Sequence, residues 1–362
     1  MTKEHKALLL LIRLGIGNEE VTEQNIQQLQ DESIDWEQVM QLSYVHSLSV
    51  IAADGYSAVK AVKPDVRLGI DNKNLWRKKA AWLADSLSAQ TDYEKYRSFI
   101  RSLAAFYAKH DIPMMLLKGY GLSLNYPQPS HRPIGDVDIY LFGKWQEADA
   151  LIRGKGIEVR EDSEHHTKFS ANGYSVENHY DFINVRLRRS SRSLEKIFKQ
   201  LATDKSEFTE LNGVRVYMPS PNLNALFLLR HTAGHFASEG ITLRPLLDWA
   251  FFMKRYGERV DGKWLIDTAR DYNMHIFLSA INNICVSYLG FEAQIFPQME
   301  RYPEYDGRIL TEVLNGADVV KDASAWLRTK RWWQHRWKHR ICYSDSMLSS
   351  FITSVTSNVF KK

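Results

Sequence analysis

The sequence predicts an α+β fold, in which a small mixed-sheet core is flanked by N-terminal and C-terminal helical regions. Before residue 110 and after residue 219, apolar residues recur at three- and four-residue spacing, as in helices with one buried face. Between these stretches the pattern changes to short apolar runs, alternating segments and an Asn-Gly turn, which are typical of strands and hairpins. We therefore expect three parts: an N-terminal helical region at residues 1–110, the mixed core at 111–218 and a C-terminal helical domain at 219–362.

The composition is that of a folded, globular chain. Of its 362 residues 44% are hydrophobic and 25% charged, a balance that excludes a largely disordered or fibrous protein. No apolar run approaches the roughly 18 residues that a membrane span requires. The two cysteines, Cys285 and Cys342, are too few for a disulfide framework, so we expect a cytoplasmic protein.

The first region is expected to be helical because it is rich in Ala, Leu, Glu, Gln and Lys and poor in strand-like runs. Its last helix carries one apolar stripe, formed by Tyr96, Phe99, Ile100, Leu103, Phe106 and Tyr107. Pro113 cannot continue that helix and marks the start of the core.

The core begins with a strand at residues 114–117, followed by a turn and a short helix at about 121–125. Residues 136–141 alternate acidic and apolar side chains, as a half-exposed strand does, and a helix is expected at 145–153. Asn172-Gly173 predicts a hairpin between strands at 167–171 and 174–182. After Pro219 and Pro221 the helical spacing returns, with helices expected at 243–256, 264–272 and 274–289.

Asp136 and Asp138 are the first residues that suggest chemistry. Residues two apart in a strand project from the same face, so the two carboxylates would lie side by side and repel each other unless cations neutralise them. Mg²⁺, with its preference for oxygen ligands, is the natural cation. Such pairs also occur on solvated strand faces, and that reading stays open.

Lys118, Gly119 and Tyr120 form the turn between the first core strand and its short helix. Backbone amides and a helix N-terminus at such a turn can bind phosphate, and Lys118 adds a positive charge. Arg132, just before the acidic strand, could make a further phosphate contact. The alternative is a capped helix beside a solvated basic loop.

Glu177 is the candidate for a third carboxylate. It shares one face of its strand with His179 and Asp181, and we prefer it to Asp181 because it lies mid-strand. Three carboxylates on two neighbouring strands could hold two Mg²⁺ ions roughly 3.5–4 Å apart, an arrangement that stabilises the attacking and leaving oxygens of a displacement at phosphorus.

These motifs together resemble the DNA polymerase β-like nucleotidyltransferase superfamily. The order of a strand ending in Lys-Gly, then Arg-x-x-x-Asp-x-Asp, then an acid in a later strand is similar to that superfamily's pattern. More narrowly, the chain resembles the bacterial branch of uncharacterised nucleotidyltransferases in these segments: residues 117–119, 126–127, 132–138, 176–180, 229–231 and 243–248. The resemblance covers residues 106–272, nearly half of the chain.

The resemblance implies transfer of a nucleoside monophosphate from an NTP to an acceptor hydroxyl on a small molecule or a protein, with two Mg²⁺ ions, or Mn²⁺ in their place. It assigns Asp136 and Asp138 to both metals and Glu177 to the catalytic one. A Gly-Ser or Gly-Gly turn is usual in the superfamily, and Gly119-Tyr120 departs from it by removing a hydroxyl that would contact phosphate. A catalytically degenerate nucleotide-binding or regulatory module is therefore the alternative.

The later helices and strand ends supply residues for the acceptor cleft: His179, Asp181, His231, Arg244 and Asp248. Arg244 and Asp248 are also spaced to form an ion pair on one helix face, and His231 and His235 to share a metal. His165 and His166 are expected to point to opposite faces of a strand, which would prevent them from sharing an ion.

The segment at residues 328–340 combines six Lys or Arg with three Trp and no acid, in a chain whose formal net charge is +4. Basic residues neutralise phosphates and aromatic rings stack on bases, so RNA binding, or an RNA-directed nucleotidyltransferase, is a further hypothesis. The same spacing also fits a helix that packs by its tryptophans.

Overall fold

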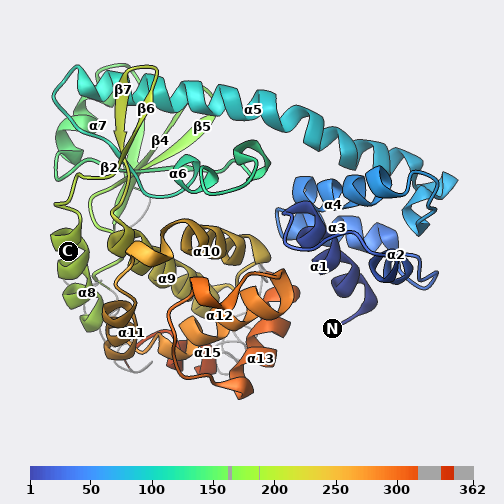
Figure 1. The fold of residues 1–362 in the computed structure, drawn as a ribbon. Coiled ribbons are helices and arrows are strands. Elements are labelled where there is room, and N and C mark those ends of the chain that lie inside the picture. The colour runs from blue at the N-terminus through green and yellow to red at the C-terminus, as the bar shows by residue number, and fades with distance from the viewer. Residues whose placement is uncertain (162–164, 187, 317–335, 346–362) are drawn as a thin grey trace, which may run out of the picture.

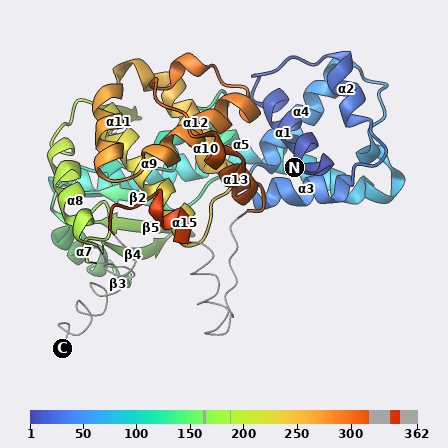
Figure 2. The same cartoon turned by 90° about the horizontal axis from the view of Figure 1, so that it is seen from below.

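The computed structural model describes residues 1–161, 165–186, 188–316 and 336–345. Figure 1 shows a sheet with helices on both faces, from which one long helix, α5, extends to a separate group of N-terminal helices. The same arrangement is seen from below in Figure 2. The predicted α+β class is confirmed.

The N-terminal group consists of α1 (Lys3–Gly15), α2 (Glu23–Leu29), α3 (Trp36–Val45) and α4 (Ser49–Val62), followed by the 3₁₀ turns η1 (Gly69–Asp71) and η2 (Lys73–Leu75). α1 and α4 cross very closely: a Cβ on Gly55 would lie 1.9 Å from the carbonyl oxygen of Leu11. The absence of a side chain at residue 55 therefore allows α1 to bury its run of leucines against α4.

The sheet contains seven described strands in the order β3-β4-β5-β2-β1-β7-β6. Their bounds are β1 (Met115–Leu116), β2 (Val137–Tyr140), β3 (Val159–Glu161), β4 (His166–Ala171), β5 (Tyr174–His179), β6 (Phe208–Leu211) and β7 (Val214–Tyr217). β2 runs parallel to β5 and antiparallel to β1, so the sheet is mixed, as predicted. The hairpin of β4 and β5 turns at Asn172-Gly173, both of which have positive φ as a two-residue hairpin turn requires.

One face of the sheet is covered by α5 (Trp76–Ala108) and α7 (Trp145–Arg153). The apolar stripe of α5 packs there against Val137 and Ile139 of β2 and Val176 of β5. Since neighbouring residues in a strand point to opposite faces, Asp138 and Glu177 face the other way, toward the C-terminal helices. On that side Tyr140 packs on Phe182, whose ring also contacts Phe227.

The remaining helices are α6 (Tyr120–Ser123), α8 (Arg189–Leu201), α9 (Pro221–Ser238), α10 (Leu243–Tyr256), α11 (Gly262–Asp271), α12 (His275–Leu289), α13 (Pro303–Leu314) and α15 (Arg336–Arg340), with the 3₁₀ turns η3 (Pro129–His131), η4 (Gly257–Arg259) and η5 (Ala293–Ile295). The helices predicted at 145–153 and 243–256 have these bounds in the structure. We propose the three-part division for the folded chain as well, although the second half of α5 packs with the core sheet.

Of the basic, Trp-rich segment at 328–340, residues 328–335 lie outside the described part of the chain and residues 336–340 lie within it. Its described part, α15, packs through Trp337 against Phe236 and Tyr305, and the buried Lys338 forms an ion pair with Glu312 at 2.5 Å. No helix among the described residues has the length and apolar character that crossing a membrane would demand.

Candidate active site

Two of the three candidate carboxylates lie side by side on the face of the sheet that looks toward the C-terminal helices, and the third precedes the strand there. Asp138 of β2 lies directly across from Glu177 of β5 in the parallel register, and Asp136 immediately precedes β2. Their side chains are 5%, 16% and 49% exposed, respectively, so the group runs from the protein interior to solvent. Asp181 lies beyond the end of β5, with its carboxylate 3.3 Å from Lys199 of α8.

Asp138 is held between two side chains that carry or can carry positive charge. Lys118 Nζ lies 2.9 Å and His179 Nε2 3.2 Å from its Oδ1 atom. Burial alone would raise the pKa of Asp138, but the Lys118 ammonium and the His179 imidazole outweigh burial and hold that pKa well below its usual range. The carboxylate therefore stays charged and is ready to bind a cation.

Lys168 of β4 is a site residue that sequence reasoning missed. Its Nζ lies 3.2 Å from Glu177 Oε1 and 3.8 Å from Asp136 Oδ2. A signal for it was present: counting outward from the Asn172-Gly173 turn pairs Lys168 with Glu177. Lys168 and Lys118 thus neutralise the carboxylates from two sides.

The Lys118-Gly119-Tyr120 turn lies next to this group, but the three residues play different parts. Gly119 has φ +62° and ψ −116°, which favours glycine strongly, and a Cβ there would lie 2.6 Å from the hydroxyl of Tyr96. The ring of Tyr120 is buried and stacks on Tyr93 of α5, with ring centroids 5.6 Å apart. Only the main chain of Tyr120, and not its side chain, is therefore available to a ligand at this turn.

Arg132 is paired with a carboxylate outside the group of three candidates. It forms a buried, two-pronged ion pair with Asp248 of α10, at 2.7 Å and 2.9 Å, and the hydroxyl of Tyr126 donates to the same carboxylate at 2.8 Å. Helical spacing predicted an ion pair between Arg244 and Asp248. In the structure the oxygens of Asp248 instead bind Arg132 and Tyr126. Arg132 as a phosphate ligand stays a prediction that would require this pair to open.

His231 of α9 is brought to the site from the C-terminal helices. Its Nε2 lies 3.3 Å from Lys118 Nζ and, because an ammonium can only donate, the ring nitrogen must accept. Burial, followed by the Lys118 charge, lowers the pKa of His231 well below its ordinary value, which keeps the ring neutral. Of the residues predicted for the acceptor cleft, His179 and His231 therefore border the acidic group, whereas Asp248 does not reach it.

His165 and His166 differ from the expectation that they point apart. His165 precedes β4 and does not follow strand alternation, so its ring contacts that of His166 with centroids 4.7 Å apart. One ligand atom from each of His165, His166 and His179 lies within 4.8 Å of the others.

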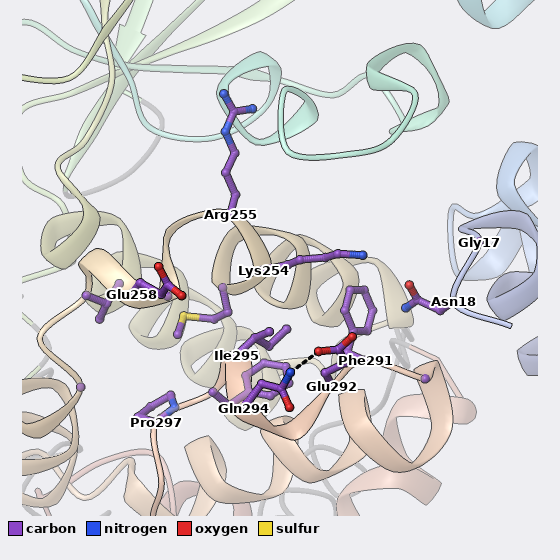
Figure 3. A pocket seen from close by; sticks show the side chains of 16 residues that line it. Gly17, Asn18, Lys254, Arg255, Glu258, Phe291, Glu292, Gln294, Ile295 and Pro297 are labelled. Carbon is purple, nitrogen blue, oxygen red and sulfur yellow. Dashed lines mark hydrogen bonds between the residues drawn. The ribbon is translucent and has the colours of Figure 1, made fainter.

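A separate pocket of about 740 Å³ lies where α10, η4 and the chain after α12 meet, with Asn18 at its edge (Figure 3). Lys254, Arg255 and Glu258 lie on one side of it and Phe291 and Glu292 on the other. None of the predicted site residues lines this pocket, so it is distinct from the acidic group.

The ligand atoms of the acidic group are spaced closely enough to bind one metal ion. Ligand atoms of Asp138, Glu177 and His179 lie within 4.8 Å of one another, and the two carboxylates offer the oxygen ligands that a hard divalent cation prefers. An α+β fold with carboxylates on adjacent strands, beside a Lys-Gly turn, defines the class of nucleotidyltransferases, which typically use divalent metals.

A model of the uncharacterised nucleotidyltransferase family matches residues 32–290, which is more than half of the chain, so the protein belongs to this family. The resemblance seen in the sequence motifs is thereby confirmed, and the protein is an enzyme of nucleotidyl transfer. Comparison with curated proteins and with solved structures found no match.

Proposed function

We propose that the protein transfers a nucleoside monophosphate from an NTP to a hydroxyl group of a small molecule, with Asp136, Asp138 and Glu177 as ligands of two Mg²⁺ ions. The observation that carries this proposal is the direct register of Asp138 with Glu177, because it brings two carboxylates from separate strands onto one face. Bound Mg²⁺ would neutralise the triphosphate and stabilise the charge that develops on the attacking and leaving oxygens.

The chain's own residues supply the rest of the chemistry. Lys118 and Lys168 balance the carboxylates before substrate binds and become free to contact phosphate oxygens when a cation takes their place. Glu177, which is less buried than Asp138, is the carboxylate suited to accept the proton of the acceptor hydroxyl. The neutral ring of His231, next to Lys118, would orient that lysine or the acceptor.

The small-molecule acceptor is favoured over RNA for one reason. Among the residues that the structure describes, the side chains paired with Asp138 and Glu177 are lysines and histidines, whereas base stacking uses aromatic rings. A protein hydroxyl remains the second choice of acceptor.

The test is an incubation of the full-length protein with each α-labelled NTP, Mg²⁺ or Mn²⁺, and pooled hydroxyl-bearing small molecules, proteins or RNA. We expect label transfer and pyrophosphate release with small molecules. Asp138→Asn and Glu177→Gln should each lower the rate at least roughly 100-fold, because each removes a carboxylate that would hold the cations, and the cations stabilise the negative charge that develops on the attacking and leaving oxygens.

Glu210→Gln is the matched control, since Glu210 is an exposed strand glutamate of β6 at the far edge of the sheet. It should leave the rate unchanged. Equal label transfer by wild type and both site variants would refute the catalytic assignment. Tight NTP binding with no transfer to any acceptor would favour the alternative of a catalytically degenerate nucleotide-binding module. That alternative is based on Tyr120, which stands where a hydroxyl that contacts phosphate is usual.

A further inference from the structure

Three imidazole rings gather at one end of the β4–β5 hairpin, beside the carboxylates. His166 opens β4 and pairs across the hairpin with His179, the last residue of β5. The carbonyl of His165 accepts hydrogen bonds from the main-chain N–H groups of Tyr180 and Asp181, both at 3.1 Å, which holds residue 165 over the end of β5. Ring centroids of the two flanking histidines lie 5.0 Å and 5.5 Å from that of His179.

His179 has the orientation of a metal ligand. Its Nδ1 lies 3.3 Å from the carbonyl oxygen of Asp181, which can only accept, so Nδ1 carries the hydrogen. With the hydrogen on Nδ1 engaged, Nε2 faces Asp138 Oδ1 at 3.2 Å and Glu177 Oε2 at 3.8 Å, and it meets them either with a proton of its own or with a lone pair that a cation shares. Two electron-rich atoms at such a distance require a cation or a proton between them. Histidines that bind metals typically donate their other N–H to a backbone carbonyl in this way.

The ligand chemistry distinguishes this cluster from the site proposed for Mg²⁺. Magnesium prefers oxygen ligands, whereas imidazole nitrogens suit zinc and its neighbours in the first transition row. Three histidines with an open fourth position form a common zinc site. We propose that His165, His166 and His179 bind a divalent transition metal of the zinc class, next to Asp138 and Glu177.

This site goes beyond the proposed nucleotidyl transfer, because it requires neither a nucleotide nor an acceptor. It would place a second kind of cation beside the carboxylates. The metal's preference for nitrogen would then keep Mg²⁺ from replacing it.

The test is equilibrium dialysis of the full-length, metal-stripped protein against Zn²⁺ alone, with elemental analysis of the bound metal. We expect about one zinc per chain, retained in excess Mg²⁺. His165→Ala and His166→Ala should each weaken zinc binding at least roughly 10-fold. His110→Ala removes an exposed histidine at the end of α5 and should change nothing.

A second readout does not depend on the variants' folding. Co²⁺ added to the stripped wild-type protein should produce visible absorption bands of a nitrogen-ligated, low-coordinate ion, and added Zn²⁺ should abolish them. The proposal is overturned by an absence of zinc binding, which would leave a proton between His179 and Asp138. It is equally overturned by zinc binding that folded His165→Ala and His166→Ala proteins retain in full.

The outcome is separable from that of the proposed function. Loss of label transfer in Glu177→Gln with zinc still bound would support both, whereas zinc binding in a protein that never transfers a nucleotide would support this inference alone.

Discussion

Tyr120 occupies the position where related turns carry a small or hydroxyl-bearing residue. Its ring is only 3% exposed and stacks on Tyr93, so the side chain belongs to the core under α5 and not to the phosphate-binding surface. The departure from the usual turn therefore has a structural reason, namely the attachment of α6 to the long helix.

Replacing this ring should affect stability before it affects chemistry. Tyr120→Ser should lower the free energy of unfolding by about 3–5 kcal/mol, because it empties a buried aromatic site. Tyr120→Phe keeps the stacking and should cost about 1 kcal/mol or less. Urea denaturation followed by circular dichroism measures both. A Ser variant as stable as wild type, with faster nucleotidyl transfer, would mean that residue 120 acts through a hydroxyl after all.

At the scale of elements, the turn between β1 and α6 depends on Gly119. Its φ of +62° is unfavourable for any residue with a Cβ, and the close hydroxyl of Tyr96 adds a steric obstacle. The turn also carries Lys118, so the position of the ammonium next to Asp138 depends on this backbone geometry.

Gly119→Ala should therefore destabilise the protein by roughly 1–3 kcal/mol and reduce label transfer. Adding Tyr96→Phe should restore only part of the stability, since it relieves the contact and not the backbone strain. The control is Gly307→Ala, within α13 and with open space around it, which should be neutral or stabilising by up to about 1 kcal/mol. Thermal unfolding measures the stability of each variant, and the transfer assay measures its activity. Equal stability and equal activity of Gly119→Ala and Gly307→Ala would contradict this prediction.

The ion pair of Arg132 with Asp248 joins the chain before β2 to helix α10. Both side chains are about 7% exposed, and the pair is completed by the Tyr126 hydroxyl. Removing either side chain would leave the charge of the other buried and unpaired, which strongly destabilises the folded protein.

Asp248→Leu and Arg132→Met should each cost about 3–5 kcal/mol of unfolding free energy, whereas the double variant Arg132→Met with Asp248→Leu should cost less than the two single changes together. Urea denaturation of the four proteins measures this coupling. If Arg132→Met instead keeps full stability and raises the KM for NTP, Arg132 is the phosphate ligand that the sequence predicted.

At the scale of the whole molecule, the N-terminal helices are bound to the C-terminal ones as well as to α5. The main-chain N–H of Leu243, at the start of α10, donates to Nδ1 of the fully buried His46 at 3.3 Å. Asn18 donates to the carbonyl of Leu289 at 3.0 Å. These bonds connect residues about 200 or more positions apart in sequence, and the first of them requires a neutral imidazole at residue 46, since Nδ1 must accept.

This contact predicts acid sensitivity. Burial, followed by the nearby His5, lowers the pKa of His46 from 6.5 to about 4. The pKa of His46 is lower in the folded than in the unfolded protein. The contribution of His46 to the free energy of unfolding, about 3 kcal/mol, is therefore fully present above pH 6.5 and is lost as the pH falls toward 4. Urea denaturation at pH 8, 6 and 4.5 should show a shallower pH dependence for His46→Gln than for wild type. His110→Gln should follow wild type, and identical curves for all three proteins would contradict the assignment.

Much of the fold and part of the site follow from local patterns. The helices at 145–153 and 243–256 and the turn at Asn172-Gly173 are determined by side-chain spacing and by the φ values that Asn and Gly tolerate. The turn also sets which residues pair across the hairpin, so the position of Lys168 beside Glu177 could have been counted from the sequence.

The sequence by itself predicted a strand that carries Asp138 and a Lys-Gly turn before it, because both are properties of neighbouring residues, whereas Asp136, expected on the same strand face, precedes the strand. Only the tertiary structure decided that Asp138 lies across from Glu177, that Arg132 pairs with Asp248, and that His231 reaches Lys118. These contacts join segments about 40 to 120 residues apart. Strand order and helix packing bring such segments together, and neither leaves a periodic signal in the chain.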